Sequence, residues 1–177
     1  NDNTNDAITW DVFGNNLKFE QWTAKFKLTI STLTNPGSLQ IDLSIGMFSL
    51  PSSTNGSTAQ DFLGLRLTRT SAGVTTYNIV DADGVDPSTV AVDATFTTAL
   101  AVATVYVKMQ RLNTTSYLIS LYSDSTYQTL TESRIGTTVY TVNGLRYFGV
   151  KNSVAAGPGT GTITGTIDNV EIFEGID

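Results

Sequence analysis

The chain has 177 residues, of which 40% are hydrophobic and 15% are charged, and a length that suggests one domain with room for a real core. It contains no cysteine and no histidine, which excludes disulfides, zinc fingers, thiol nucleophiles and Ser-His-Asp triads. Only oxygen ligands remain for a metal ion, and these favour calcium. Its net charge of -6 argues against nucleic-acid binding, which needs clustered positive charge, and no apolar run approaches the roughly 20 residues of a membrane-spanning helix.

Hydrophobic and polar residues alternate with a period of two along the whole chain, which predicts half-buried β-strands. In chain order these segments are 7–13, 22–30, 39–47, 63–68, 103–110, 117–121, 145–149 and 163–172. Clusters rich in Gly, Pro, Asn and Asp predict turns between them, at 35–37, 51–57, 83–84, 143–144 and 157–159. We therefore predict one all-β domain over residues 1–177, a two-sheet antiparallel β-sandwich with almost no helix.

In each alternating segment, the hydrophobic residues at every second position are expected to form the core. Its members are Phe26, Leu28, Leu43, Ile45, Leu65, Val105, Val107, Ile119, Leu121, Ile167 and Val170. In the last segment the parity changes, because Ile163 and Ile167 share one phase while Val170 and Ile172 share the other. A regular strand would turn one of these pairs to solvent, so we predict a β-bulge near Asp168.

Three motifs in the second half of the chain resemble concanavalin A-like jelly rolls of the lectin/glucanase and laminin-G type. Residues 165–173, which read GTIDNVEIF, are similar to the closing strand of that family. Residues 106–111 with 117–124 resemble its central hairpin, and residues 145–150 resemble the strand before the closing one. The resemblance implies a jelly roll of two curved antiparallel sheets, the concave one often carrying the ligand, and it does not imply one function.

Carboxylates that could hold a structural Ca²⁺ occur at two places. Asp81, Asp83 and Asp86 surround a glycine turn with a spacing seen in calcium loops, although the distal glutamate of an EF-hand is absent. The alternative is an acidic surface turn whose side chains bond their own backbone. The resemblance implies a second site at Asp168, where similar domains often bind an ion together with an acid from the N-terminal strand, here Asp11. The alternative at Asp168 is a hydrogen bond that stabilises the bulge.

Aromatic and polar side chains fall opposite the aliphatic core phase and predict a glycan-binding face, because aromatic faces and planar polar groups hold sugars. These residues are Arg66, Tyr77, Tyr106, Lys108 and Tyr122. Ordinary cross-strand packing is the alternative explanation. Catalysis is not expected. The glucanases of the resembled family carry several acids on one strand, whereas Glu171 and Glu174 are three positions apart and face opposite sides of a regular strand.

Two functions remain from the sequence. The preferred one is a structural subunit of a cell-surface filament, sheath or layer, and the alternative is a lectin or adhesin that binds glycan on the concave sheet. The polar, weakly charged composition favours an extracellular or cell-surface location, and a start at Asn1 without methionine fits a cleaved signal or an excised fragment.

The N-terminal segment is expected to mediate self-association. Ile8, Trp10 and Val12 alternate with polar or outward positions, so residues 1–13 could be exchanged between subunits by strand addition. The competing interpretation keeps this segment as the first strand of its own sandwich.

Overall fold

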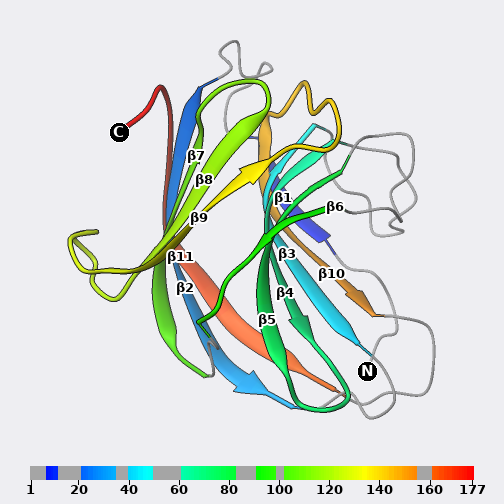
Figure 1. Ribbon diagram of the computed structural model, residues 1–177. Coiled ribbons are helices and arrows are strands. Elements are labelled where there is room, and N and C mark those ends of the chain that lie inside the picture. Colours follow the sequence, from blue (N-terminus) through cyan, green and yellow to red (C-terminus); the bar gives the residue numbers. More distant parts are fainter. Residues whose placement is uncertain are drawn as a thin grey trace.

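The computed structural model describes residues 7–11, 21–34, 40–49, 61–82, 91–98, 102–154 and 161–177. Within these ranges the chain forms eleven β-strands, arranged in two antiparallel sheets that pack face to face (Figure 1). No part of this described chain is a helix with the length and hydropathy needed to cross a membrane. The predicted fold class, a two-sheet antiparallel β-sandwich, is confirmed.

The six-stranded sheet has the order β1-β10-β3-β4-β5-β6. Its strands are β1 (Ala7–Asp11), β3 (Ile41–Phe48), β4 (Phe62–Arg69), β5 (Thr75–Ala82), β6 (Ala91–Thr95) and β10 (Tyr147–Val154). The five-stranded sheet has the order β11-β2-β7-β8-β9. Its strands are β2 (Trp22–Leu33), β7 (Thr104–Arg111), β8 (Ser116–Tyr122), β9 (Leu130–Thr137) and β11 (Ile163–Glu174).

The core lies between the sheets and agrees with the predicted parity, with one error. Eight of the eleven predicted core residues are buried, and Leu43 and Ile167 are partly buried and pack against them. Val170 is wrongly placed by the prediction, because its side chain is 40% exposed. It lies at an irregular point of β11, an edge strand that has a neighbour on one side only.

The predicted β-bulge is confirmed. Asp168 pairs with Lys27 and Glu171 pairs with Lys25, so three steps along β11 match two steps along β2. Asn169 takes the extra position with a φ of 53°, in the left-handed region that Asn tolerates better than most residues. The bulge allows Ile172 to pack against the core although its parity differs from that of Ile167.

The N-terminal strand lies at the edge of its own sheet. β1 pairs with β10 of the same chain, with Ile8 in register with Val150 and Trp10 in register with Phe148. This is the arrangement of the competing interpretation given above. Val12 lies outside the described residues, and strand exchange between subunits stays a prediction.

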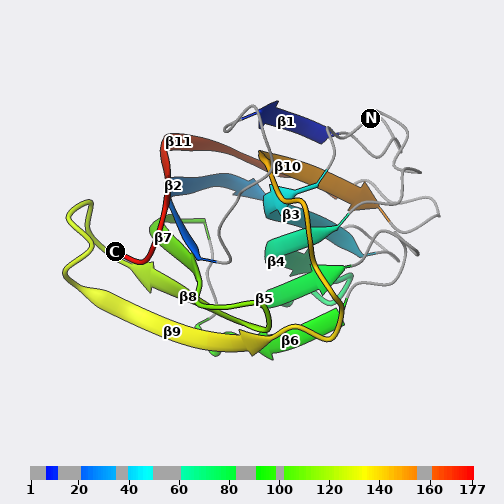
Figure 2. The same ribbon diagram turned by 90° about the horizontal axis from the view of Figure 1, so that it is seen from above.

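The two sides of the sandwich differ (Figure 2). On one side the edge strands β6 and β9 are in contact. On the other side a cavity of about 240 Å³ opens between β2 and β11 of one sheet and β3 and β10 of the other. Its apolar lining includes Leu28, Ile30, Leu43, Val150 and Ile167.

Candidate functional site

Two lysines and two tyrosines lie side by side on the outer face of the five-stranded sheet. Lys25 on β2 pairs with Lys108 on β7, and Tyr106 on β7 pairs with Tyr122 on β8. Side chains of paired residues point to the same face, and the residues between them along each strand are buried in the core. All four side chains are partly exposed, so they form a continuous surface.

The loop between β8 and β9 adds a third tyrosine to this surface. The Tyr127 ring lies 6.1 Å from that of Tyr106 and 5.5 Å from that of Tyr122, centroid to centroid, in edge-to-face geometry. The Lys25 ammonium is 5.4 Å from the Tyr127 centroid and 5.5 Å from that of Phe173 on β11, within cation–π range. We call this surface the tyrosine–lysine patch, formed by Lys25, Tyr106, Lys108, Tyr122, Tyr127 and Phe173.

Asp124 fixes the position of Tyr127. Tyr127 has a φ of 55°, which a bulky residue adopts only when the surrounding structure supports it. The Asp124 carboxylate accepts hydrogen bonds from the backbone N–H groups of Thr126 at 2.9 Å and Thr129 at 2.6 Å. The hydroxyl of Thr126 and the backbone N–H groups of Thr129 and Gln128 lower the pKa of Asp124. The loop is therefore wound around a carboxylate that stays ionised.

Burial also sets the ionisation of Tyr127. It raises the pKa of the phenol to about 12, and the nearby Glu171 carboxylate and Tyr106 add to the effect. The hydroxyl therefore stays protonated at neutral pH and can donate one hydrogen bond.

The two lysines of the patch hold Asp177. Both ammonium groups form ion pairs with its carboxylate, Lys108 at 3.4 Å and Lys25 in a closer contact. The Asp177 main-chain oxygen accepts hydrogen bonds from Lys108 Nζ at 2.7 Å and from Gln110 Nε2 at 2.8 Å. The Lys25 contact and the charge of Lys108 lower the pKa of Asp177.

Three of the five predicted glycan-binding residues come together in this patch, namely Tyr106, Lys108 and Tyr122. Arg66 lies on β4 in the other sheet and in register with Asn78, so it belongs to a different face. The placement of Tyr77 was wrong, because its side chain is fully buried and pairs with the core residue Leu67. Tyr77 was assigned to the outer phase although no strand was predicted over residues 75–82, and in β5 it occupies the inner phase.

Sequence reasoning missed Lys25, Tyr127, Phe173 and Asp177. Lys25 could have been found, because it occupies an outward position of a predicted strand. Phe173 follows the bulge, which changes the face of the sheet to which the alternating pattern assigns the residues after it. Tyr127 and Asp177 lie outside any alternating segment, so no periodic signal marks them.

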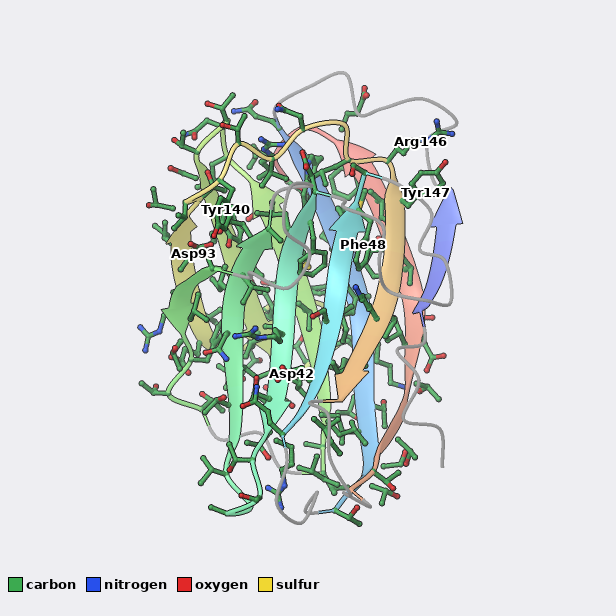
Figure 3. All side chains as sticks on the ribbon, turned by 90° about the vertical axis from the view of Figure 1, so that its right-hand side faces the viewer. Asp42, Phe48, Asp93, Tyr140, Arg146 and Tyr147 are labelled. Atoms are coloured by element: carbon green, nitrogen blue, oxygen red, sulfur yellow. The ribbon has the colours of Figure 1, made fainter. Side chains whose placement is uncertain are left out.

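The predicted calcium ligand Asp81 is buried between the sheets. It is fully inaccessible, and its Oδ2 accepts the backbone N–H of Tyr140 at 2.8 Å. Its carboxyl group lies against that of Asp93, which accepts a hydrogen bond from the Tyr117 hydroxyl. Asp93 and Tyr140 are labelled close together beside β6 in Figure 3. Burial raises the pKa of both carboxyl groups, that of Asp93 to about 7, with the Asp81 charge adding to it.

The other predicted ligands do not assemble into a metal centre among the described residues. Asp168 accepts a hydrogen bond from the Thr166 hydroxyl at 3.1 Å and lies 3.9 Å from Lys27 Nζ. Asp11 is on β1 in the other sheet, and Asp83 and Asp86 lie outside the described residues. No three acidic side chains of the described chain come together as a metal site requires. The calcium sites stay predictions.

Comparison with known proteins identifies the fold. No family model matches the chain, and a search of curated proteins finds no match. The CBM2 module of the evolved Dit of Lactobacillus casei BL23 phage J-1 is similar with a TM-score of 0.56 and 9% identity, over 97% of this chain and 69% of that chain. CG-16, a homodimeric agglutinin from chicken liver, is similar with a TM-score of 0.50 and 10% identity, over 96% of this chain and 99% of that chain. Scytalido-glutamic peptidase with a transition state analog inhibitor is similar with a TM-score of 0.53 and 10% identity, over 97% of this chain and 80% of that chain.

At these identities the likeness shows the fold alone. The protein is a jelly-roll β-sandwich, and the resemblance to concanavalin A-like jelly rolls is confirmed at the level of the fold. The similar structures include an agglutinin and a peptidase, so the function has to be argued from the site.

Proposed function

We propose that the protein is a non-catalytic carbohydrate-binding module that holds a glycan on the tyrosine–lysine patch. The observation that carries this proposal is the fixed position of Tyr127. Hydrogen bonds to Asp124 support its positive φ and place its ring beside Tyr106 and Tyr122. Strain that the surrounding structure maintains at one surface residue is typical of functional sites.

The composition of the patch suits a sugar ligand. Aromatic rings offer apolar faces to the C–H groups of a sugar, while lysine, glutamine and tyrosine hydroxyl groups bond its oxygens. Lys25 lies 5.4 Å from the Tyr127 ring centroid, Lys108 is two positions from Tyr106 along β7, and Gln110 is two positions beyond Lys108. The jelly-roll fold agrees with this function, because a CBM2 module and an agglutinin have the same architecture.

The described acidic residues favour binding over catalysis. Glycoside hydrolysis usually needs two carboxyl groups that flank one bond. Glu171 and Glu174 pair with Lys25 and Trp22, which face opposite sides of the sheet. Asp81 and Asp93 do form a pair, but the oxygen atoms that remain without a hydrogen bond are buried, so a substrate cannot reach them.

The filament, sheath or layer subunit has less support. It was preferred from the sequence because the N-terminal segment could complete the sheet of a neighbour. In the described chain β1 already pairs with β10 of the same molecule, so this sheet needs no donated strand to cover β10. Carbohydrate binding is therefore the function that we propose.

A glycan array followed by titration calorimetry tests the proposal. The protein should bind at least one class of glycan, and Tyr127→Ala should weaken binding about tenfold, the worth of one aromatic contact. Asp124→Ala, which releases the loop without removing a ring, should weaken binding in the same direction. Tyr147→Ala is the matched control, because Tyr147 lies on β10 in the other sheet, beside Phe48 (Figure 3).

The outcomes separate clearly. Loss of affinity in Tyr127→Ala and not in Tyr147→Ala supports the site. If the unaltered protein binds no glycan, the function is wrong. If Tyr147→Ala loses affinity and Tyr127→Ala does not, the site is on the other sheet and the assignment of the patch is wrong. Circular dichroism of each variant shows whether the sandwich is intact.

A further inference from the structure

The contacts of Asp177 resemble the contacts of a bound ligand. Its carboxylate meets two lysines, and its main-chain oxygen meets a lysine and an amide. Its N–H donates to the Thr23 hydroxyl at 3.3 Å. These groups come from β2 and β7, neighbouring strands in the middle of the sheet, and Asp177 follows β11 at its edge. Asp177 therefore forms hydrogen bonds and ion pairs with side chains of β2 and β7, although it follows a different strand, β11.

The chain is shaped to bring Asp177 to this position. Gly175 has a φ of 97°, which favours glycine, and it turns the chain out of β11. Its N–H donates to the Gln21 carbonyl at 3.0 Å, and its own carbonyl accepts the Thr23 hydroxyl at 2.9 Å. Figure 2 shows the C-terminal end beside β7, on the side of the five-stranded sheet away from the other sheet.

The lysines need an anion at this place. Their side chains are only 17% and 15% exposed for Lys25 and Lys108, and Gln110 is 6% exposed. Partly desolvated ammonium groups that lie opposite one another repel unless an anion lies between them. Among the described residues, Asp177 is the acid that forms an ion pair with both. The side chain of Asp177 is 46% exposed, so water and solutes reach the contact.

We propose that Lys25, Lys108 and Gln110 form a carboxylate-binding subsite of the tyrosine–lysine patch, that its ligand is an acidic saccharide, and that Asp177 occupies the subsite until this ligand displaces it. The inference rests on the proposed function. The neighbouring tyrosine rings select a sugar over a free carboxylate, because they lie beside the subsite and bind the ring that carries the acid. The ammonium groups of Lys25 and Lys108 and the Nε2 amino group of Gln110 all donate hydrogen bonds here, and two positive charges favour a uronic acid over a neutral sugar.

Asp177 acts as an internal competitor. The apparent dissociation constant of a ligand rises as the fraction of open subsites falls. The Asp177 carboxylate is 46% exposed, and water weakens an ion pair on its exposed side, so an external carboxylate with an added ring contact can displace it. The net charge of -6 opposes the approach of an anion over long distances, so binding should depend on the local contacts with Lys25 and Lys108.

The test uses a panel of uronic acid tetrasaccharides, built from galacturonate, glucuronate, mannuronate or guluronate, and their methyl esters, which keep the sugars and remove the charge. We expect at least one acid to bind more tightly than its ester. Asp177→Asn should tighten binding of that acid about three- to tenfold and leave the ester unchanged. Lys108→Gln should weaken binding of that acid about tenfold. Lys151→Gln is the matched lysine control, because it lies on β10 in the other sheet.

The result that overturns the inference differs from the one that overturns the proposed function. If neutral glycans bind through Tyr127 while no uronic acid is preferred, or if Asp177→Asn leaves the affinity for the acid unchanged, the patch is a glycan site and the carboxylate subsite is wrong. If neither the unaltered protein nor Asp177→Asn binds any glycan, acidic or neutral, both are wrong. Unfolding midpoints of the three variants show whether a change in affinity comes from a change in folding.

Discussion

The two sides of the sandwich are closed by different means. Where β6 and β9 meet, Glu132 on β9 accepts hydrogen bonds from the backbone N–H groups of Thr97 at 2.9 Å and Thr98 at 2.8 Å, and from both hydroxyls. On the opposite side, β2 and β11 face β3 and β10 across an apolar cavity of about 240 Å³. One side is held by directional polar contacts and the other by apolar packing that remains incomplete.

The polar side contains a second set of contacts between the sheets. The hydroxyl of Tyr117 on β8 donates to Asp93 on β6, and the backbone N–H of Tyr140, which follows β9, donates to Asp81 on β5. Each acid on this side is matched by donors from the opposite sheet or its connection. The comparison teaches that hydrogen bonds across the gap fix one edge of this sandwich, while the other edge keeps room to adjust.

The largest expected effect compares two leucines. Leu121 is fully buried and pairs with Glu132 on the polar side, whereas Leu43 is partly exposed and lines the cavity. Leu121→Ala should lower the free energy of unfolding by about 4 kcal/mol and Leu43→Ala by about 2 kcal/mol, because a site that is already open creates less new cavity. Urea unfolding measures both. Equal losses would show that the two sides are packed alike.

The next effect tests the polar contacts themselves. Glu132→Ala leaves the donors of Thr97 and Thr98 without their acceptor and should cost about 3 kcal/mol of unfolding free energy. Asp168→Ala, on β11 at the cavity side, removes an exposed acid 3.9 Å from Lys27 and should change stability by less than about 0.5 kcal/mol. Urea unfolding of both variants decides this, and similar losses would remove the distinction between the edges.

The sequence predicted those features that depend on neighbours along the chain. The alternation in β2, β3, β7 and β8 gave their strands and core, and the parity change at Asp168 gave the bulge. β5 was missed because Val80, on its outer face, is also buried, so polar and apolar residues no longer alternate there. β9 was missed because it is a mostly polar edge strand.

The candidate site divides in the same way. Tyr106, Lys108 and Tyr122 lie on one hairpin, so their common face follows from parity alone. The position of Tyr127 depends on hydrogen bonds to Asp124 within a loop. Asp177 reaches its partners through contacts between residues more than 60 positions apart. Contacts of these two kinds leave no periodic trace in a sequence.

A smaller effect concerns pH. Burial, with the charge of Asp81, raises the pKa of Asp93 from 3.8 to about 7, so the folded protein keeps this proton at a pH where the unfolded chain releases it. The stability it contributes is complete below about pH 4 and is lost as pH rises through about 7. Because the group is partly exposed, we expect a loss of about 1 kcal/mol, or roughly 3 °C in Tm, between about pH 5 and 8.

Asp93→Asn isolates this contribution. The amide imitates the protonated acid, since it can donate to Asp81 and accept from Tyr117, and it should remove the fall in Tm between about pH 5 and 8. Glu132→Gln is the matched control. Burial favours the neutral form of Glu132, but the N–H and O–H groups of Thr97 and Thr98 outweigh it and lower the pKa to about 2. This contribution is complete above about pH 4.5 and lost as pH falls toward 2, so the fall above pH 5 should remain.

The smallest effect fills the cavity. Val150 on β10 lines it and is partly exposed, so Val150→Ile adds one methylene to open apolar space and keeps a β-branched side chain suited to a strand. It should raise the free energy of unfolding by up to about 0.8 kcal/mol. Val107 is fully buried in the core, and Val107→Ile should instead cost about 1 kcal/mol through overpacking. Thermal unfolding shows whether each variant gains or loses stability. A loss of unfolding free energy in Val150→Ile as large as that in Val107→Ile would mean that the cavity side is as tightly packed as the interior.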